Sequence, residues 1–114
     1  MTCFIYIATP TEWGNKKNGH YNGFKIGYTA NPKQRNYILR STDGYTIRAT
    51  YTIEAESHYD GEDVEKMAQR IYRTEYMAKQ LGNDYFKASK VTTDKAVRHF
   101  VEIAERAYNK VMGV

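Results

Sequence analysis

The sequence predicts an α+β fold with a small three-stranded, mostly antiparallel sheet flanked by helices. Residues 3–9, 23–28 and 46–55 have the patterns of strands, and longer stretches have the helical spacing of apolar residues. The expected order is two strands, a helix, a strand, a helix, a short extended segment and a last helix. Two strands that follow one another and are joined by a loop are expected to pair antiparallel.

Side-chain patterns justify each strand. Residues 3–9 are apolar at successive positions, which is typical of a strand buried on both faces. Residues 23–28 form a shorter strand in which Gly27 permits the close approach of another group. Residues 46–55 show the clearest alternation, with apolar side chains at the odd positions and polar ones at the even positions. Residues 85–88 fit either a short strand or a tucked aromatic segment.

Capping residues and apolar spacing justify three helices. The first is expected over residues 31–40, with Asn31 as its N-cap and Pro32 as its first residue. The second is expected from Glu62 to a stop at Gly82. Its core-facing side chains are expected to be Val64, Met67, Ala68, Ile71 and Tyr72. The last helix is expected to begin at Asp94 and to continue to about residue 111.

The length fits one folded unit. We expect a single domain over residues 1–114, with a core at 3–88 and a C-terminal helix at about 94–111. The longest apolar run near the N-terminus, residues 3–8, is much shorter than the about 20 residues of a membrane-spanning helix, so no membrane partner is expected. The one cysteine, Cys3, cannot form an internal disulfide, which favours a cytoplasmic or other intracellular setting.

Charge is unevenly distributed along the chain. Residues 1–50 contain seven basic and two acidic residues, a net charge of +5, whereas residues 51–114 have a net charge of −1. A basic half suits a polyanion such as nucleic acid. On charge alone, however, a basic domain with a solvated acidic loop is the favoured interpretation. The residues that we expect to contact DNA are Lys16, Lys17, His20, Lys33 and Arg40.

An ordered set of motifs resembles the GIY-YIG nuclease superfamily. The first strand contains Tyr6, the second contains Lys25-Ile26-Gly27-Tyr28-Thr29, and Arg35 follows the glycine by eight residues. Glu65 stands on the later helix. Residues 83–86, Asn-Asp-Tyr-Phe, look like the acidic-aromatic-Phe motif of a divergent phage and bacterial branch in which KIG replaces YIG. The resemblance covers the core and implies a GIY-YIG-like fold.

The resemblance implies a metal-dependent endonuclease that hydrolyses DNA phosphodiester bonds by water attack. The expected cofactor is Mg²⁺, for which Mn²⁺ can substitute, and Glu65 is the expected metal ligand. Lys25 and Arg35 are expected to bind the phosphate, because a planar guanidinium can bind two of its oxygens at once. Either Tyr6 or Tyr28 is the expected base, and a phenol needs a neighbouring cation such as Lys25 to ionise near neutral pH.

Two other interpretations stay open. Lys25 stands where the superfamily's motif has tyrosine, which favours a catalytically inactive GIY-YIG-like module that binds DNA or a protein partner. Alternatively, the basic half binds nucleic acid, and Glu65 is a solvated acid near the start of its helix, like Glu62 and Asp63. We also expect that sequence-specific cleavage by a domain of this size requires a homodimer or a protein partner.

Overall fold

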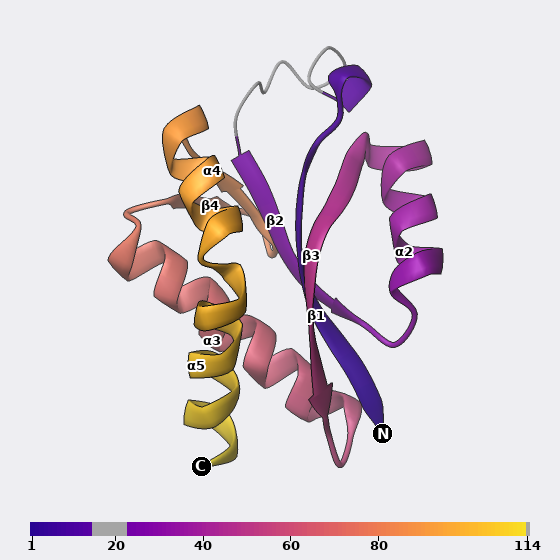
Figure 1. The fold of residues 1–114 in the computed structure, drawn as a ribbon, viewed down its shortest axis with the longest axis vertical. Helices are drawn as coiled ribbons and strands as arrows, with labels where there is room; N and C mark the ends of the chain where they lie inside the picture. The colour runs from indigo at the N-terminus through magenta and orange to yellow at the C-terminus, as the bar shows by residue number, and fades with distance from the viewer. Residues whose placement is uncertain (15–22, 114) are drawn as a thin grey trace.

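The computed structural model describes residues 1–14 and 23–113 and confirms the α+β class, with an antiparallel sheet flanked by helices (Figure 1). The sheet has five strands rather than the predicted three, in the order β3-β1-β2-β5-β4. The strands are β1 (Thr2–Pro10), β2 (Gly23–Thr29), β3 (Tyr45–Glu54), β4 (Lys79–Leu81) and β5 (Tyr85–Lys87). Of the two additional strands, β5 confirms the strand alternative for residues 85–88, whereas β4 has only three residues, which is too short for a clear alternation of side chains.

Strand β1 lies inside the sheet and pairs antiparallel with both β2 and β3. Its register with β2 places Tyr6 opposite Gly27 and Ile5 opposite Tyr28. Successive side chains of a strand point to opposite faces of the sheet. The two tyrosines that were candidates for the base therefore lie on different faces.

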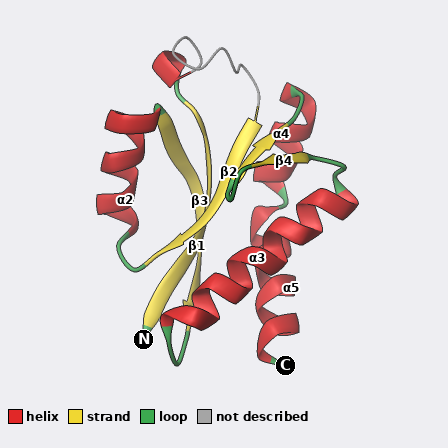
Figure 2. Ribbon diagram, turned by 180° about the vertical axis from the view of Figure 1, so that it is seen from behind, coloured by secondary structure: helices red, strands yellow, loops and turns green. Residues whose placement is uncertain are grey.

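Helices cover both faces of the sheet. The helical elements are α2 (Pro32–Ile38), a π-helical turn η1 (Leu39–Asp43), α3 (His58–Glu75), α4 (Lys90–Arg98) and α5 (Phe100–Met112). Figure 2 shows α2 on one side of the sheet and α3 and α5 on the other. None of the helices in the described residues has the length and the apolar character that crossing a membrane requires.

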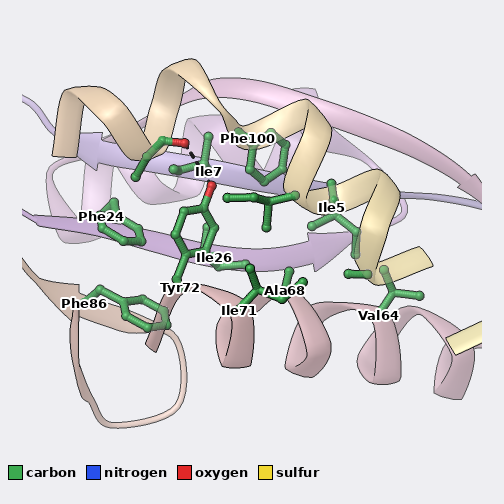
Figure 3. Packing of buried hydrophobic residues seen from close by; sticks show 14 of the residues in the cluster. Ile5, Ile7, Phe24, Ile26, Val64, Ala68, Ile71, Tyr72, Phe86 and Phe100 are labelled. Atoms are coloured by element: carbon green, nitrogen blue, oxygen red, sulfur yellow. Dashed lines mark hydrogen bonds between the residues drawn. The ribbon is translucent and has the colours of Figure 1, made fainter. Parts of the chain in front are cut away.

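The main core lies between the sheet and the α3–α5 layer (Figure 3). The predicted stripe of α3 is confirmed, since Val64, Ala68, Ile71 and Tyr72 are buried in this core and Met67 packs against it. The Tyr72 hydroxyl, which is fully buried, donates a 2.8 Å hydrogen bond to the Ala96 carbonyl oxygen of α4. The opposite face has a smaller cluster made of Tyr6, Ala8, Leu39 and Tyr45.

The predicted bounds of α3 were wrong at both ends. The helix begins at His58 because the Asp60 carboxylate accepts hydrogen bonds from the backbone N–H groups of Glu56 (2.9 Å) and Ser57 (3.4 Å). It ends at Glu75, soon followed by Met77 with a positive φ of 54°. Gly82, the predicted end, instead lies in the turn between β4 and β5 with a φ of 73°.

The C-terminal helix was also predicted too short at its start. Ser89 accepts a hydrogen bond from the backbone N–H of Thr92 and caps α4, so the helix begins at Lys90 rather than Asp94. The expected continuous helix is interrupted at His99, where α4 ends and α5 follows. The His99 Nδ1 atom is 2.7 Å from the Tyr76 hydroxyl, which ties this junction to the end of α3.

Candidate active site

The second half of β2 forms an open edge of the sheet. Strand β5 pairs with β2 only at residues 23–25. At the next residue, the Ile26 N–H donates to the Asp84 carbonyl oxygen (2.9 Å), and the Ile26 carbonyl accepts from the Gln69 side chain (2.9 Å). Beyond this point, none of the described strands pairs with this side of Gly27 and Tyr28. Side chains from both faces of the sheet can therefore approach each other around this edge.

An open groove of about 710 Å³, which we call the α3 groove, lies between α3, Tyr28 and the β4–β5 hairpin. The residues that line it are Tyr28, Glu62, Glu65, Lys66, Gln69, Arg73, Gln80, Gly82 and Asn83. It thus contains two of the predicted site residues, Tyr28 and Glu65. It also brings the turn at Asn83 next to them.

Tyr6 reaches the same edge from the opposite face because it lies over a glycine. A Cβ atom on Gly27 would be 2.4 Å from the Tyr6 hydroxyl oxygen, so any side chain there would displace the ring. Burial raises the pKa of Tyr6 to about 12, and the nearby Arg35 opposes this increase, whereas Asp84 and Glu65 add to it. The phenol is therefore protonated at neutral pH and lies within electrostatic reach of Arg35 and Glu65.

Lys25 is placed differently from our expectation. Its Nζ atom is 3.3 Å from the Asp43 carboxylate and 4.9 Å from the centre of the Tyr45 ring. The cation that lowers the pKa of Tyr6 is Arg35, and Lys25 is not among the groups that perturb it. Lys25 is thus engaged by the turn that follows α2, and the expected coupling between Lys25 and Tyr6 stays a prediction.

Tyr28 lies in the α3 groove and interacts with an acid rather than a cation. Its hydroxyl donates to the Glu62 carboxylate at 3.4 Å. Burial and the charge of Glu62 both raise the pKa of Tyr28. Neither candidate phenol is thus ionised near neutrality by the protein's own charges.

The carboxyl group of Glu65 has a strongly raised pKa. Burial, together with the nearby carboxylates of Asp84 and Glu62, raises the pKa of Glu65 to about 7, while Lys66 and Arg35 act weakly in the opposite direction. Acids gathered in a partly buried groove suit a divalent cation, which offsets their repulsion. The described residues contain no group of three or more His, Cys, Asp or Glu side chains that could hold a metal. The donor set fits Mg²⁺, which is often bound by only one or two carboxylates and keeps its waters.

Arg35 projects from the first turns of α2, whose start is defined as predicted by Asn31 and Pro32. The Asn31 side chain accepts a hydrogen bond from the Gln34 N–H at 3.1 Å. Arg35 is exposed, and no carboxylate of the described residues forms an ion pair with it. Its guanidinium is therefore available to bind an anion. Its charge also lowers the pKa values of both Tyr6 and Glu65, against the larger effect of burial.

Gln69 is a site residue that the sequence analysis missed. Its side chain is 3% exposed, and its amide nitrogen donates to the Ile26 carbonyl oxygen at 2.9 Å and to the Glu65 carboxylate at 3.3 Å. Its amide oxygen accepts from the Gln80 side chain at 3.4 Å. Gln69 thus holds Glu65 at the edge of β2. One feature of the sequence could have indicated Gln69. It is a polar residue next to Ala68 of the apolar stripe, and it follows the candidate metal ligand Glu65 by four residues.

The structure describes two of the five residues that we expect to contact DNA. Lys16, Lys17 and His20 lie outside the described residues. Lys33 is exposed on α2, two residues before Arg35. Arg40 is exposed on η1, and its guanidinium donates to the Thr46 hydroxyl at 3.4 Å. Both placed residues are thus exposed on the segment formed by α2 and η1.

The chain matches a known protein family over most of its length. The model of the T5orf172 domain matches residues 3–102 of the chain. This phage-associated domain is related to nuclease-like folds and is consistent with a nuclease or DNA-binding role. No curated protein and no solved structure matches the chain.

Proposed function

Because the chain belongs to the T5orf172 domain family, we propose that it acts on DNA, as a metal-dependent endonuclease of the GIY-YIG type that hydrolyses phosphodiester bonds by water attack. The observation that supports this proposal is that the charges of Arg35 and Glu65 both act on the pKa of Tyr6, whose phenol lies over Gly27 at the open edge of β2. These groups come from three separate elements, and each perturbs or is perturbed by the others. They are the residues that the family resemblance singled out in the sequence.

Each group has a distinct role in the proposal. Arg35 binds the phosphate and offsets its charge, since its guanidinium is exposed and forms no ion pair with a described carboxylate. Glu65 holds the cation, and Gln69 holds the Glu65 carboxylate in place. When bound, Mg²⁺, or Mn²⁺ in its place, supplies positive charge to the phosphate and the departing oxygen.

The remaining role is that of the group that accepts a proton from the attacking water. Tyr6 is the stronger candidate because it has Arg35 as a cationic neighbour, whereas Tyr28 is hydrogen-bonded to Glu62. With a pKa of about 12, Tyr6 accepts a proton near neutral pH only if further positive charge comes close to it. The rate is therefore expected to rise with pH through the neutral range.

A second candidate function is the non-catalytic module that binds DNA or a protein partner. One observation that favours it is the ion pair between Lys25 and Asp43. Lys25 replaces the motif tyrosine, and this ion pair engages the charge that would otherwise bind the phosphate. It is also favoured by the raised pKa of both candidate phenols. A homodimer or protein partner as the source of sequence specificity stays a prediction.

A plasmid-nicking assay with Mg²⁺ or Mn²⁺ separates the two functions. Glu65→Gln should abolish cleavage while DNA binding survives, because it removes the charge that holds the cation. Arg35→Lys should also reduce cleavage, because an ammonium cannot bind two phosphate oxygens in a plane. Glu102→Gln, an exposed acid on α5, is the matched control and should nick normally.

Two results would decide against the enzyme or its assigned ligand. A wild-type protein that binds DNA but never nicks it with either metal would favour the module. Full cleavage by Glu65→Gln would remove Glu65 from the metal site.

A further inference from the structure

Basic side chains continue the α3 groove away from Glu65. Lys66 and Arg73 line the groove, and the exposed Arg70 lines an adjoining hollow together with Lys66 and Arg73. Figure 2 shows the course of α3, which carries all three. Asp63 lies one turn before Lys66. In the part of the chain that the structure describes, however, no carboxylate forms an ion pair with Lys66 or Arg73. Two cations are thus presented to the groove without a protein anion bound to them.

Arg73 is held in a defined position relative to Glu65. Its guanidinium donates to the amide oxygen of Gln80, which lies in β4. The Gln80 amide nitrogen donates in turn to Gln69 (3.4 Å) and to the Asn83 carbonyl oxygen (2.9 Å). Since Gln69 also donates to Glu65, an unbroken series of hydrogen bonds joins the guanidinium to the carboxylate. A cation oriented in this way loses less conformational freedom when it binds an anion.

The spacing along α3 fits a nucleic-acid strand. Eight residues separate Glu65 from Arg73, which is about 12 Å along the helix axis. Successive phosphates of one strand in a duplex are about 3.4 Å apart along the duplex axis. A strand with one phosphate at Glu65 therefore has another within reach of Arg73 a few nucleotides away, and Lys66 lies next to the first of these positions.

Resting on the proposed function, we propose that Lys66 and Arg73 bind backbone phosphates of the DNA strand that is cut, so that this strand lies along α3 from Glu65 towards the β4–β5 hairpin. This surface is separate from the basic residues of the N-terminal half. Its two cations balance Glu62 and Glu65 in the groove, so a divalent cation at Glu65 makes the groove net positive. Phosphate binding at this surface and cation binding at Glu65 should then favour each other.

The test measures DNA binding in EDTA, where cleavage does not occur. The full chain is titrated into a fluorescently labelled 20-base-pair duplex, and anisotropy is followed at several salt concentrations. Lys66→Gln/Arg73→Gln should weaken binding about tenfold at 50 mM salt and reduce the slope of log K against log salt by about two. Arg98→Gln/Lys110→Gln removes two exposed charges from α4 and α5 and should have a much smaller effect on both quantities.

A second readout uses nicking. If the two cations bind only flanking phosphates, Lys66→Gln/Arg73→Gln should raise the KM for DNA and leave kcat close to that of the wild type. Equal losses in the two double variants would show a general charge effect and overturn the inference. An unchanged salt slope in Lys66→Gln/Arg73→Gln, with normal wild-type binding, would overturn it while leaving the proposed function intact. A wild-type protein that binds no DNA would overturn both.

Discussion

Replacing Glu65 by glutamine should stabilise the protein at neutral and alkaline pH. Burial and the neighbouring carboxylates of Asp84 and Glu62 raise the pKa of Glu65 from 4.5 to about 7. The folded state therefore holds the Glu65 proton more tightly than the unfolded state does. Glutamine resembles the protonated carboxyl group in shape and charge, and it can still accept the hydrogen bond from Gln69.

The size of the expected change in the free energy of unfolding follows from the pKa shift of Glu65. Below pH 4.5 the carboxyl group is protonated in both states, and the substitution should change the free energy of unfolding little. Between pH 4.5 and about 7 the folded state binds the additional proton, so the wild type loses stability as the pH rises. At about 1.4 kcal/mol per pKa unit, the loss reaches about 3 kcal/mol above pH 7. Glu65→Gln should avoid this loss.

Urea denaturation at pH 4.5, 6, 7 and 8.5, followed by circular dichroism, measures the difference directly. The advantage of Glu65→Gln should grow with pH and level off above pH 7, and Glu102→Gln should show no such growth. Saturating Mg²⁺ should stabilise the wild type, by about 2.7 kcal/mol at 100 times its Kd, and not the variant. A variant that is destabilised equally at every pH would refute the view that Glu65 is a partly buried acid with a raised pKa.

Three further substitutions test the rest of the site. Gly27→Ala should cost about 1–3 kcal/mol and abolish nicking because its methyl group displaces the Tyr6 ring, and the stability cost should vanish in a Tyr6→Ala background. Gln69→Leu should cost about 1–3 kcal/mol in urea denaturation because it leaves the Ile26 carbonyl without its side-chain donor. Lys25→Met should leave the pH dependence of nicking unchanged, and a shifted profile would show that Lys25 acts on Tyr6 after all.

The fold was predicted where local patterns are long. The strands at residues 3–9, 23–28 and 46–55 have enough residues for an apolar run or an alternation of side chains to be visible, and β1 and β2 pair antiparallel as expected. Strand β4 could not be predicted, because Lys79–Leu81 has three residues and continues the composition of the helix before it. It forms through pairing with β5, a tertiary effect that a short window of sequence does not contain.

The candidate site was predicted by motif and not by geometry. Tyr6, Arg35 and Glu65 come from distant parts of the sequence, and their order in the chain shows neither register nor face. The motif also does not indicate the ion-pair partner of Lys25. Lys25 pairs with β1 two residues from the position opposite Tyr6, yet the turn after α2 supplies Asp43 and engages its charge. Gln69 was missed because its two hydrogen-bond partners at Ile26 and Glu65 become neighbours only in the folded protein.

The early end of β5 explains why a site can form at this place. A sheet normally separates the side chains of its two faces, which would keep Tyr6 apart from Glu65. Because β5 leaves β2 after Lys25, the backbone at Gly27 is an edge, and the missing side chain there lets the phenol lie across it. Extending β5 by two residues would restore a continuous sheet and close the passage between the faces. The turn at Asp84 is thus as necessary to the arrangement as the charged groups themselves, since β5 begins only after it, at Tyr85.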